Sequence, residues 1–304
     1  MANTTEFILL GLSENLQVQV IVFQIFLFFY MSTVFGNVLL IVAVRTDRRL
    51  HHSMYFFLSN LSFLDICYTS IIVPKMLMNI AMSSRNISFA GCLLQVYFYL
   101  LMGECVLLAF MAYDRYVAIC NPLHYSLIMN PGSCVRMICV SWITGFTISS
   151  IDIYFMCQLR FCGHTTIDHF FCEAPSLLQL SCSDISANNI VTFVGSSILL
   201  VIPVCLILYS YLKIFLVLVK IGSRRYKAFS TCVSHLIVVI IFYGTATFMY
   251  MKPRHSSTEV TDKMVSVFYT VVTPMLNPLI YSLRNKDVRR ALGRSRCHRT
   301  RITF

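Results

Sequence analysis

Long apolar stretches separated by short polar segments dominate this chain. Seven of them reach the roughly 20 residues that a helix needs to cross a bilayer: residues 18–44, 53–80, 93–114, 136–156, 190–219, 231–250 and 263–283. Their apolar positions do not alternate with polar ones, which disfavours the strands of a membrane barrel. The pattern predicts an all-α membrane protein, a bundle of seven transmembrane helices.

Composition and charge give the orientation. The chain is 57% hydrophobic and 12% charged, with a mean hydropathy of +0.73, whereas soluble domains carry about 25% charge. Most of the 24 Lys and Arg residues fall in segments 45–52, 115–136, 213–227 and 284–304; the other side holds only Lys75, Arg85, Arg160, Lys252, Arg254 and Lys263. Because basic loops stay inside, residues 1–17 are expected to be extracellular and residues 284–304 cytoplasmic. The net charge of +11 then favours anionic membrane lipid over nucleic acid as a partner.

Two further signals concern export. Residues 1–16 lack a charged start and a cleavage site, so the first span is expected to act as the insertion signal. The sequons at Asn3 and Asn86 fall on the expected outer side, and both are candidate glycosylation sites. The sequon at Asn60 lies inside the second span and is expected to remain unmodified.

An acidic and a basic residue stand together at the end of the third apolar stretch. Residues 111–125 read MAYDRYVAICNPLHY, so Asp114 and Arg115 lie where a helix leaves the membrane on the basic side. Charges at that depth are expensive and are usually functional. A guanidinium can be held there by the neighbouring carboxylate in one state and released to a partner in another. The pair therefore indicates a two-state switch rather than an active site.

This block resembles the odorant receptors, a branch of the rhodopsin-like G-protein-coupled receptors. Other segments agree, in order along the chain: Gly36-Asn37, LHHSMYFFLSNLSFLDICYTS from Leu50, Ser210-Tyr211, KAFSTCVSHL from Lys227 and PMLNPLIYSLRN from Pro274. The resemblance implies one receptor domain over residues 1–304, with a short cytoplasmic amphipathic helix after the seventh span. It also implies a small-molecule odorant as ligand and a heterotrimeric G protein of the stimulatory, olfactory type as partner.

The resemblance also implies which residues switch the receptor. They are Asp114, Arg115, Tyr116, Tyr211, His235, Asn277, Pro278 and Tyr281. Pro278 interrupts the backbone hydrogen bonds and makes a hinge. Tyr281 can then swing toward Tyr211 and Arg115 when the sixth helix moves outward. His235 has two interpretations, a pH-sensitive switch or a core histidine with satisfied hydrogen bonds.

Four of the 13 cysteines lie on the expected outer side. Cys92 begins the third span, and Cys162, Cys172 and Cys182 lie in the long second outer loop. Four cysteines allow three pairings, of which the resemblance implies Cys92–Cys172 and Cys162–Cys182. The alternative is a metal site that uses His164 and His169, which flank these cysteines.

Two acids fall inside the membrane, Asp65 midway along the second span and Glu104 midway along the third. A buried carboxylate needs a partner, a proton or a cation. The resemblance implies a shared polar core with Asn37 as neighbour, in which the two acids bind one sodium ion or share a proton. The alternative is two protonated acids that are hydrogen-bonded separately. No other cofactor or metal is expected.

The ligand is expected in the outer half of the bundle. No acid precedes Glu104 in the third span, and Val271 stands where opsins carry the lysine that binds retinal. The lining therefore suits a small, mostly apolar, volatile molecule with one hydrogen-bonding group. The candidate lining residues are Tyr97, Phe98, Leu101, Ser196, Leu199, Tyr243, Thr247, Tyr250, Val267 and Thr270.

The chain departs from the family pattern in the third span. Cys92 and Arg115 are 23 positions apart (115 − 92). This is about two fewer than the family pattern, and two residues turn a helix face by roughly 200°. The deficit falls between Gln95 and Glu104. Two expectations depend on this deficit: the direction in which the side chains of Tyr97 to Met102 point, and whether Cys92 reaches Cys172. The loop at residues 220–227 is also short.

Other functions remain as alternatives. The chain could be a rhodopsin-like receptor for another small ligand outside the olfactory system, or a receptor impaired in signalling. A transporter would show inverted repeats and a channel a polar stripe, and neither is visible. No H-E-x-x-H or G-x-S-x-G motif is present, so an enzyme is not expected.

Overall fold

The seven predicted spans form a bundle of long helices. The structure is a computed structural model that describes residues 6–13, 15–82, 84–101, 104–163, 165–221, 225–251, 259–284 and 288. The first spans are α1 (Leu16–Thr46), α2 (Ser53–Ala81), the pair α3 (Phe89–Leu101) and α4 (Glu104–Cys120), and α6 (Pro131–Met156). The remaining spans are α8 (Ser186–Ile221), α9 (Arg225–Met251), and the last span built from α10 (Glu259–Val267), η5 (Phe268–Val272) and α11 (Thr273–Arg284).

Length and composition agree with a membrane location. In the described residues, α1, α2, the α3–α4 pair, α6 and α8 are long and apolar enough to cross a bilayer, and α9 contributes a shorter apolar stretch, His235–Phe248. Helix ends follow local sequence. The side chain of Asn15 accepts a hydrogen bond from the backbone N–H of Gln17 before α1, and Asn130 with Pro131 begins α6, as N-cap residues do.

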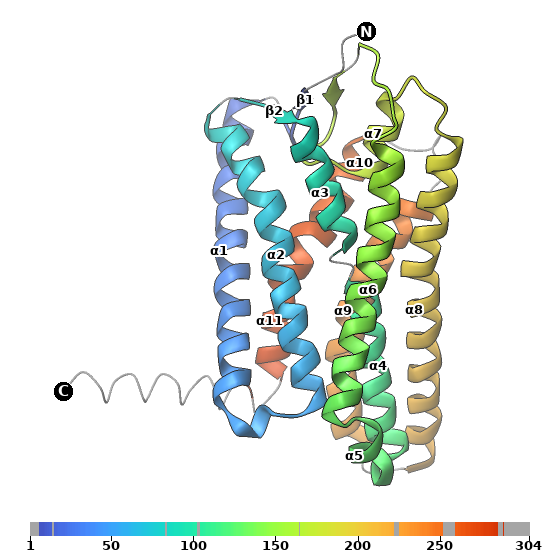
Figure 1. Ribbon diagram of the computed structural model, residues 1–304. Coiled ribbons are helices and arrows are strands. Elements are labelled where there is room, and N and C mark those ends of the chain that lie inside the picture. Colours follow the sequence, from blue (N-terminus) through green and yellow to red (C-terminus); the bar gives the residue numbers. More distant parts are fainter. Residues whose placement is uncertain are drawn as a thin grey trace, which may run out of the picture.

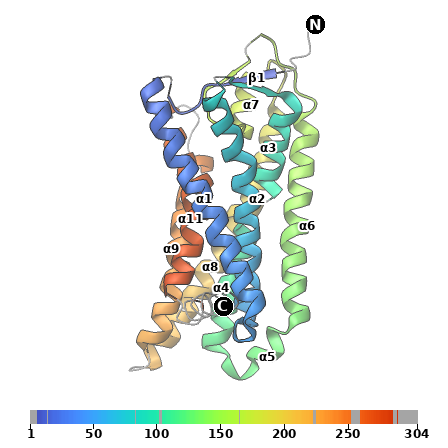
Figure 2. The ribbon, with the colours of Figure 1, turned by 90° about the vertical axis from the view of Figure 1, so that its left-hand side faces the viewer.

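The two ends of the bundle differ. At one end, called the sheet end below, β1 (Glu6–Leu9) lies between β2 (Asn86–Ser88) and β3 (Thr166–Ile167), antiparallel to β2 and parallel to β3. The short helix α7 (Ala174–Leu180) lies at the same end (Figure 1). The Arg115 end carries η1 (Arg48–Leu50), η2 (Pro122–His124) and α5 (Tyr125–Ile128). Figure 2 shows α5 at the opposite end of the bundle from β1.

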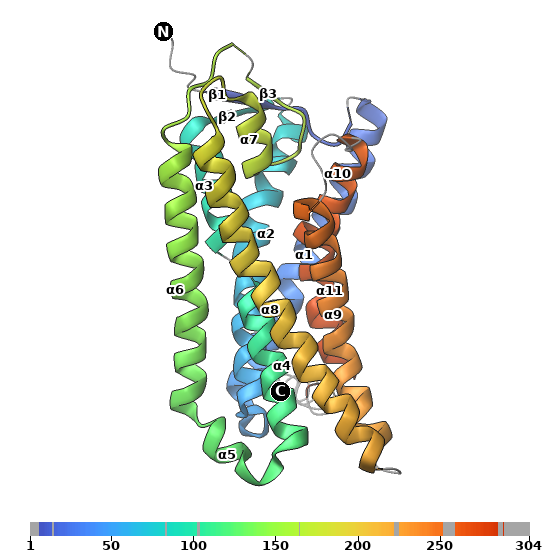
Figure 3. The same cartoon turned by 90° about the vertical axis from the view of Figure 1, so that its right-hand side faces the viewer.

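The shortened third span comprises α3 and α4, which lie on either side of residues 102 and 103. α3 packs mainly on α6, whereas α4 packs mainly on α8. Figure 3 shows α8 crossing in front of α4. The carbonyl oxygen of Leu101, the last residue of α3, lies only 2.5 Å from where a Cβ on Gly145 of α6 would be. Only glycine allows this approach. The last described turn of α3 therefore lies against the backbone of α6, and residues 102 and 103 lie outside the described residues.

Two expectations fall outside what the structure describes. The cytoplasmic amphipathic helix after the seventh span would lie in residues 285–304, of which only Val288 is described. Residues 222–224 of the short loop at residues 220–227 are likewise not described.

Candidate functional site

A cavity of about 70 Å³ lies within the bundle toward the sheet end. Every span except the first and the fourth contributes to its wall. Most of the wall is apolar or aromatic, and the polar groups are tyrosine hydroxyls, one serine and one carboxyl group. The lining residues are Tyr68, Tyr99, Leu100, Glu104, Cys105, Ser196, Leu199, Leu200, Phe242, Ala246 and Tyr269. Such a wall binds a small, largely apolar molecule and fixes its orientation through a few polar groups.

The three residues of the third span that were expected to line the cavity do not line it, and two neighbouring residues do. Ser196 and Leu199 line the cavity, but Tyr99 and Leu100 stand where Tyr97, Phe98 and Leu101 were expected. Tyr97 packs edge-on against Phe146 of α6. Leu101 lines a separate small pocket beside Trp142. α3 packs on α6, and Tyr97 faces that helix instead of the cavity.

Four further candidates are buried or lie elsewhere. The hydroxyl of Tyr243 donates to the carbonyl oxygen of Cys105 at 2.7 Å, so it ties α9 to α4. Thr247 lines an open groove between α8 and α9. The hydroxyl of Thr270 donates to Ser266 in its own helix. Val267 packs against the core, and the side chain of Tyr250 lies outside the described residues.

Tyr269, which was not among the candidates from the sequence, reaches the cavity from η5. This segment is a π-helix, and Thr273 donates its hydroxyl to the carbonyl oxygen of Phe268, five residues earlier. One extra residue per turn rotates Tyr269 inward, where its hydroxyl pairs with Ser266 at 2.9 Å. π-turns inside helices are frequent at functional sites. No residue pattern in this segment signals the extra residue.

The loop that covers the cavity carries two disulfides, one of which fixes it to the bundle. Cys92 bonds Cys172 with a Cα–Cα distance of 5.3 Å, so the shortened span does not prevent this pairing. Beside it, the side-chain oxygen of Gln95 accepts from the backbone N–H of Cys172 at 2.9 Å. Its amide nitrogen donates to the carbonyl oxygen of Ile71. The loop is thereby held to α3 and α2 together.

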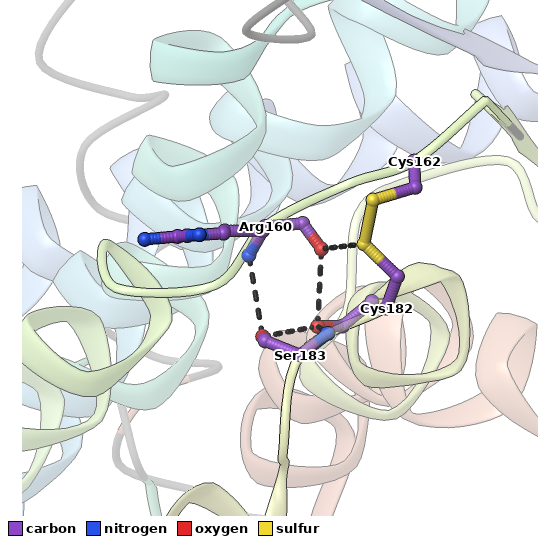
Figure 4. The surroundings of a disulfide bond; sticks show 5 residues. Arg160, Cys162, Cys182 and Ser183 are labelled. Carbon is purple, nitrogen blue, oxygen red and sulfur yellow. Dashed lines mark hydrogen bonds between the residues drawn. A yellow bond between two sulfur atoms is a disulfide. The ribbon is translucent and has the colours of Figure 1, made fainter. Parts of the chain in front are cut away.

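The second disulfide joins the two arms of the loop. Cys162 bonds Cys182 with a Cα–Cα distance of 5.8 Å. Figure 4 shows the backbone of Arg160 beside it, with its N–H donating to the hydroxyl of Ser183 at 3.3 Å. The metal alternative is not supported, because the cysteines that it would use are paired in the two disulfides. His164 lies outside the described residues.

Two titratable groups of this loop are buried under the sheet end. Burial raises the pKa of Glu173 to about 7; Ser176 donates to its carboxylate at 3.2 Å, and Tyr269 is also hydrogen-bonded to it. Burial also lowers the pKa of His169 to about 3, and its ring stacks on Phe170 with centroids 4.7 Å apart. Next to it, a salt bridge joins Asp168 to Lys263 of α10.

Buried polar side chains, among them Asp65, Glu104 and Asn37, lie below the cavity. Asn277 donates to both carboxylate oxygens of Asp65, at 3.1 and 3.0 Å. The carboxyl groups of Asp65 and Glu104 lie close enough for a proton to bridge them. Asn37 donates to the carbonyl oxygens of Thr33 and Pro274. The second carboxylate oxygen of Glu104 and the amide oxygens of Asn37 and Asn277 have no partner among the described residues.

At the Arg115 end, Asp114 is held by hydroxyl groups instead of Arg115. Ser53 donates to its carboxylate at 2.5 Å and Tyr125 at 2.9 Å. The described residues form no salt bridge between Asp114 and Arg115. The Nε of Arg115 is buried without a partner in the described part of the chain. The neighbouring carboxylate that was expected to hold Arg115 is thus engaged with α2 and α5.

A second contact at this end joins α8 to α9. The hydroxyl of Tyr211 lies 2.6 Å from Nδ1 of His235, and the two rings stack at 24°. His235 is fully buried, and its Nε2 has no partner among the described residues. Tyr116 and Tyr211 pack against the same cluster of Ile214, Leu218 and Cys232. The expected partner of Tyr211, the side chain of Tyr281, lies outside the described residues.

The glycosylation candidates are only partly described. Asn86 lies exposed in β2, and its amide donates to Glu6 at 3.2 Å. Asn3 lies outside the described residues. Modification of either residue remains a prediction.

Comparison with known proteins agrees with this geometry. A family model described as "Olfactory receptor" matches residues 26–299. The chain is 48% identical to olfactory receptor 2G3 of Homo sapiens, over 94% of each chain. It is 49% identical to olfactory receptor 5AP2 of Mus musculus, over 95% of this chain and 92% of that one. The crystal structure of squid rhodopsin shares the fold, with a TM-score of 0.72 at 17% identity, over 91% of this chain and 85% of that one. The chain therefore belongs to the olfactory receptor family, as a multi-pass membrane protein and a signalling receptor rather than an enzyme.

Proposed function

We propose that this receptor binds a small, mostly apolar, volatile odorant in the cavity between α3, α4, α8, α9 and η5 and then activates a stimulatory G protein. The observation that carries the proposal is the wall of this cavity, in which apolar side chains surround Ser196, Tyr269 and the carboxyl group of Glu104. One hydrogen-bonding group on the ligand would satisfy the unpaired oxygen of Glu104. Membership of the olfactory receptor family supports this ligand class.

The cavity is directly connected to α9, the helix that must move. Cys105 and Phe242 line it, and the carbonyl oxygen of Cys105 accepts the hydroxyl of Tyr243. A ligand that displaces the wall at either residue changes this bond between α4 and α9. Farther along the same helix, the contact between His235 and Tyr211 holds α9 to α8. Ligand binding would thus change the position of α9 at the Arg115 end.

Arg115 is the group we propose to engage the G protein. Its neighbour Asp114 already accepts two hydroxyl groups, so a movement of α9 can expose the guanidinium without first breaking an internal salt bridge. Arg115→Ala should abolish ligand-driven cAMP formation at unchanged surface level. Arg136→Ala, which removes an exposed basic residue of α6, is the matched control. Equal signalling by both variants would exclude this role.

The proposed topology has the sheet end outside the cell and the Arg115 end in the cytoplasm, at the plasma membrane, with anionic inner-leaflet lipid as neighbour. The distribution of Lys and Arg supports it. The two disulfides lie at the sheet end, where an oxidising exterior would allow them. Protease protection of tagged termini in sealed vesicles would test it.

For Asp65 and Glu104 we propose that they share one sodium ion or one proton. Carboxylate and amide oxygens suit a hard cation, and no basic side chain is hydrogen-bonded to either acid in the described residues. Asp65→Asn and Glu104→Gln should each alter basal signalling, and the double variant should be far less than additive. Replacing sodium by a large organic cation separates the two possibilities, because only a bound ion makes signalling depend on sodium. Strict additivity would show that the acids act separately.

The odorant assignment is tested by a cAMP assay in cells that present the receptor at their surface, screened with a panel of volatile compounds. Leu199→Trp fills the cavity and should remove the response. Leu206→Trp on the same helix is the control, because Leu206 is 51% exposed on the lipid-facing side and lines none of the cavity. Loss of response in both variants, or in neither, would contradict binding at this cavity.

A further inference from the structure

A large groove of about 1200 Å³ opens at the Arg115 end, on the side away from α8 and α9. It lies between the end of α1, the start of α2, α5 and the start of α6. Its lining residues differ in polarity from one part of the groove to the other. One part is apolar, with Ile41, Val44, Phe56, Phe63 and Val135, and the other is polar and basic, with Arg45, His51, His52, Ser126 and Asn130.

The apolar part is open to the membrane. Phe56, Phe63 and Val135 are 37%, 50% and 50% exposed, although they line a concave surface rather than a flat helix face. These residues belong to the ends of α2 and α6 that lie within the leaflet on this side. A concave apolar surface at this depth provides continuous contact for a hydrocarbon chain.

The mouth of the groove is positively charged. Arg45, His51 and His52 are exposed there, and Arg48 and Arg49 lie on the adjacent turn. No Asp or Glu is among the described residues that line the groove. Basic pockets between membrane helices on the cytoplasmic side are typical sites for phosphorylated lipid headgroups. The charge and the apolar wall together match an amphiphile with an anionic head.

We propose that this groove binds one anionic phospholipid of the cytoplasmic leaflet. Its headgroup phosphate would lie against Arg45 and the two histidines, and one acyl chain would follow Phe56 and Phe63. Ser53 and Tyr125 also line the groove, and they are the two groups that hold Asp114. The lipid would therefore lie one side chain away from the Asp114–Arg115 pair. It would influence how the receptor couples to its G protein. The proposal rests on the proposed topology but not on the odorant.

Lipid retention by the purified full-length receptor tests the proposal. The receptor is delipidated in detergent and offered phosphatidylinositol 4-phosphate or phosphatidylcholine of the same chain length, and bound lipid is counted by native mass spectrometry. One equivalent of the phosphoinositide should be retained in preference to phosphatidylcholine. Arg45→Gln should weaken retention about fivefold, the factor expected from one basic residue near a headgroup. Arg49→Gln removes the same charge outside the groove and should have a smaller effect.

A second pair of variants tests the apolar part. Val135→Trp fills the groove, whereas Val140→Trp adds the same bulk to an equally exposed position on α6 outside it. Only the first should reduce phosphoinositide retention, while a water-soluble inositol phosphate should compete weakly with the full lipid. Equal retention in both members of either pair would overturn the proposal. So would equal binding of the two phospholipids, or retention of a sterol or a second receptor copy in their place.

Discussion

The sheet end and the Arg115 end of this receptor are held together by different kinds of bond. At the sheet end, two disulfides, a three-stranded sheet and the salt bridge between Asp168 and Lys263 connect segments far apart in the sequence. At the Arg115 end, Cys120, Cys134 and Cys232 are free thiols. The contacts described there are hydrogen bonds of single hydroxyl groups.

This difference shows how one bundle can keep a binding site and still move. A covalently fixed cover keeps the cavity wall in place, so that binding energy is not lost in ordering it. Hydrogen bonds contribute only about 1 kcal/mol each, which is small enough for a ligand to shift the balance between two states. The following predictions test this contrast, from the largest expected effect to the smallest.

Removal of the disulfide at the sheet end should have the largest effect. Cys172→Ser releases a bond between residues 80 positions apart, and loss of a native disulfide costs about 2–5 kcal/mol. Surface expression, measured by antibody labelling of intact cells, should fall to background. Cys139→Ser, at an exposed free cysteine, should express normally. Normal expression of Cys172→Ser would show that the cover does not depend on this bond.

A substitution at the close approach of α3 to α6 should have the next largest effect. Gly145→Ala places a methyl group 2.5 Å from the carbonyl oxygen of Leu101, and such overpacking costs about 1–3 kcal/mol. The thermal midpoint of the purified receptor should fall accordingly. Gly244→Ala is the control, because no atom lies within 4 Å of the added carbon, and its midpoint should not fall. A common decrease would mean that glycine in these helices matters for another reason.

At the Arg115 end, loss of the contact between α8 and α9 should have a moderate effect, which appears as a change in signalling. Tyr211→Phe removes the hydroxyl that pairs with His235. A lost hydrogen bond of about 1 kcal/mol shifts an equilibrium about fivefold. Basal cAMP should rise because α9 is held less firmly, while surface level stays constant. Tyr209→Phe, at a tyrosine 54% exposed, should leave basal signalling unchanged; a rise there as well would exclude the His235 contact as the cause.

The last expected effect, at Glu173, depends on pH and disappears in acid. Its pKa is raised from 4.5 to about 7 by burial, so folding favours the protonated form. Its contribution to stability is complete below about pH 4.5 and is lost as pH rises toward and through 7. Glu173→Gln keeps the neutral shape. The difference in thermal midpoint between variant and wild type should be near zero at pH 4.5 and grow in favour of the variant up to about pH 8. A constant difference would contradict burial of the carboxyl group.

The sequence determined the spans and the pairs of residues that the family pattern implies. Long apolar stretches leave no choice but a helix, because every backbone group in a bilayer must be satisfied within the segment. All seven spans lie where the pattern predicted them. Both disulfides that the family resemblance implied are also present.

Only the tertiary structure decided the direction in which individual side chains point. Hydrophobicity is nearly uniform around a buried membrane helix, so the sequence carries little record of which side points inward. In the third span, Tyr97 faces α6 and Tyr99 lines the cavity. The π-turn brought in Tyr269. The hydroxyl groups of Ser53 and Tyr125 reached Asp114 from two other elements, because such contacts depend on how helices pack and not on their spacing along the chain.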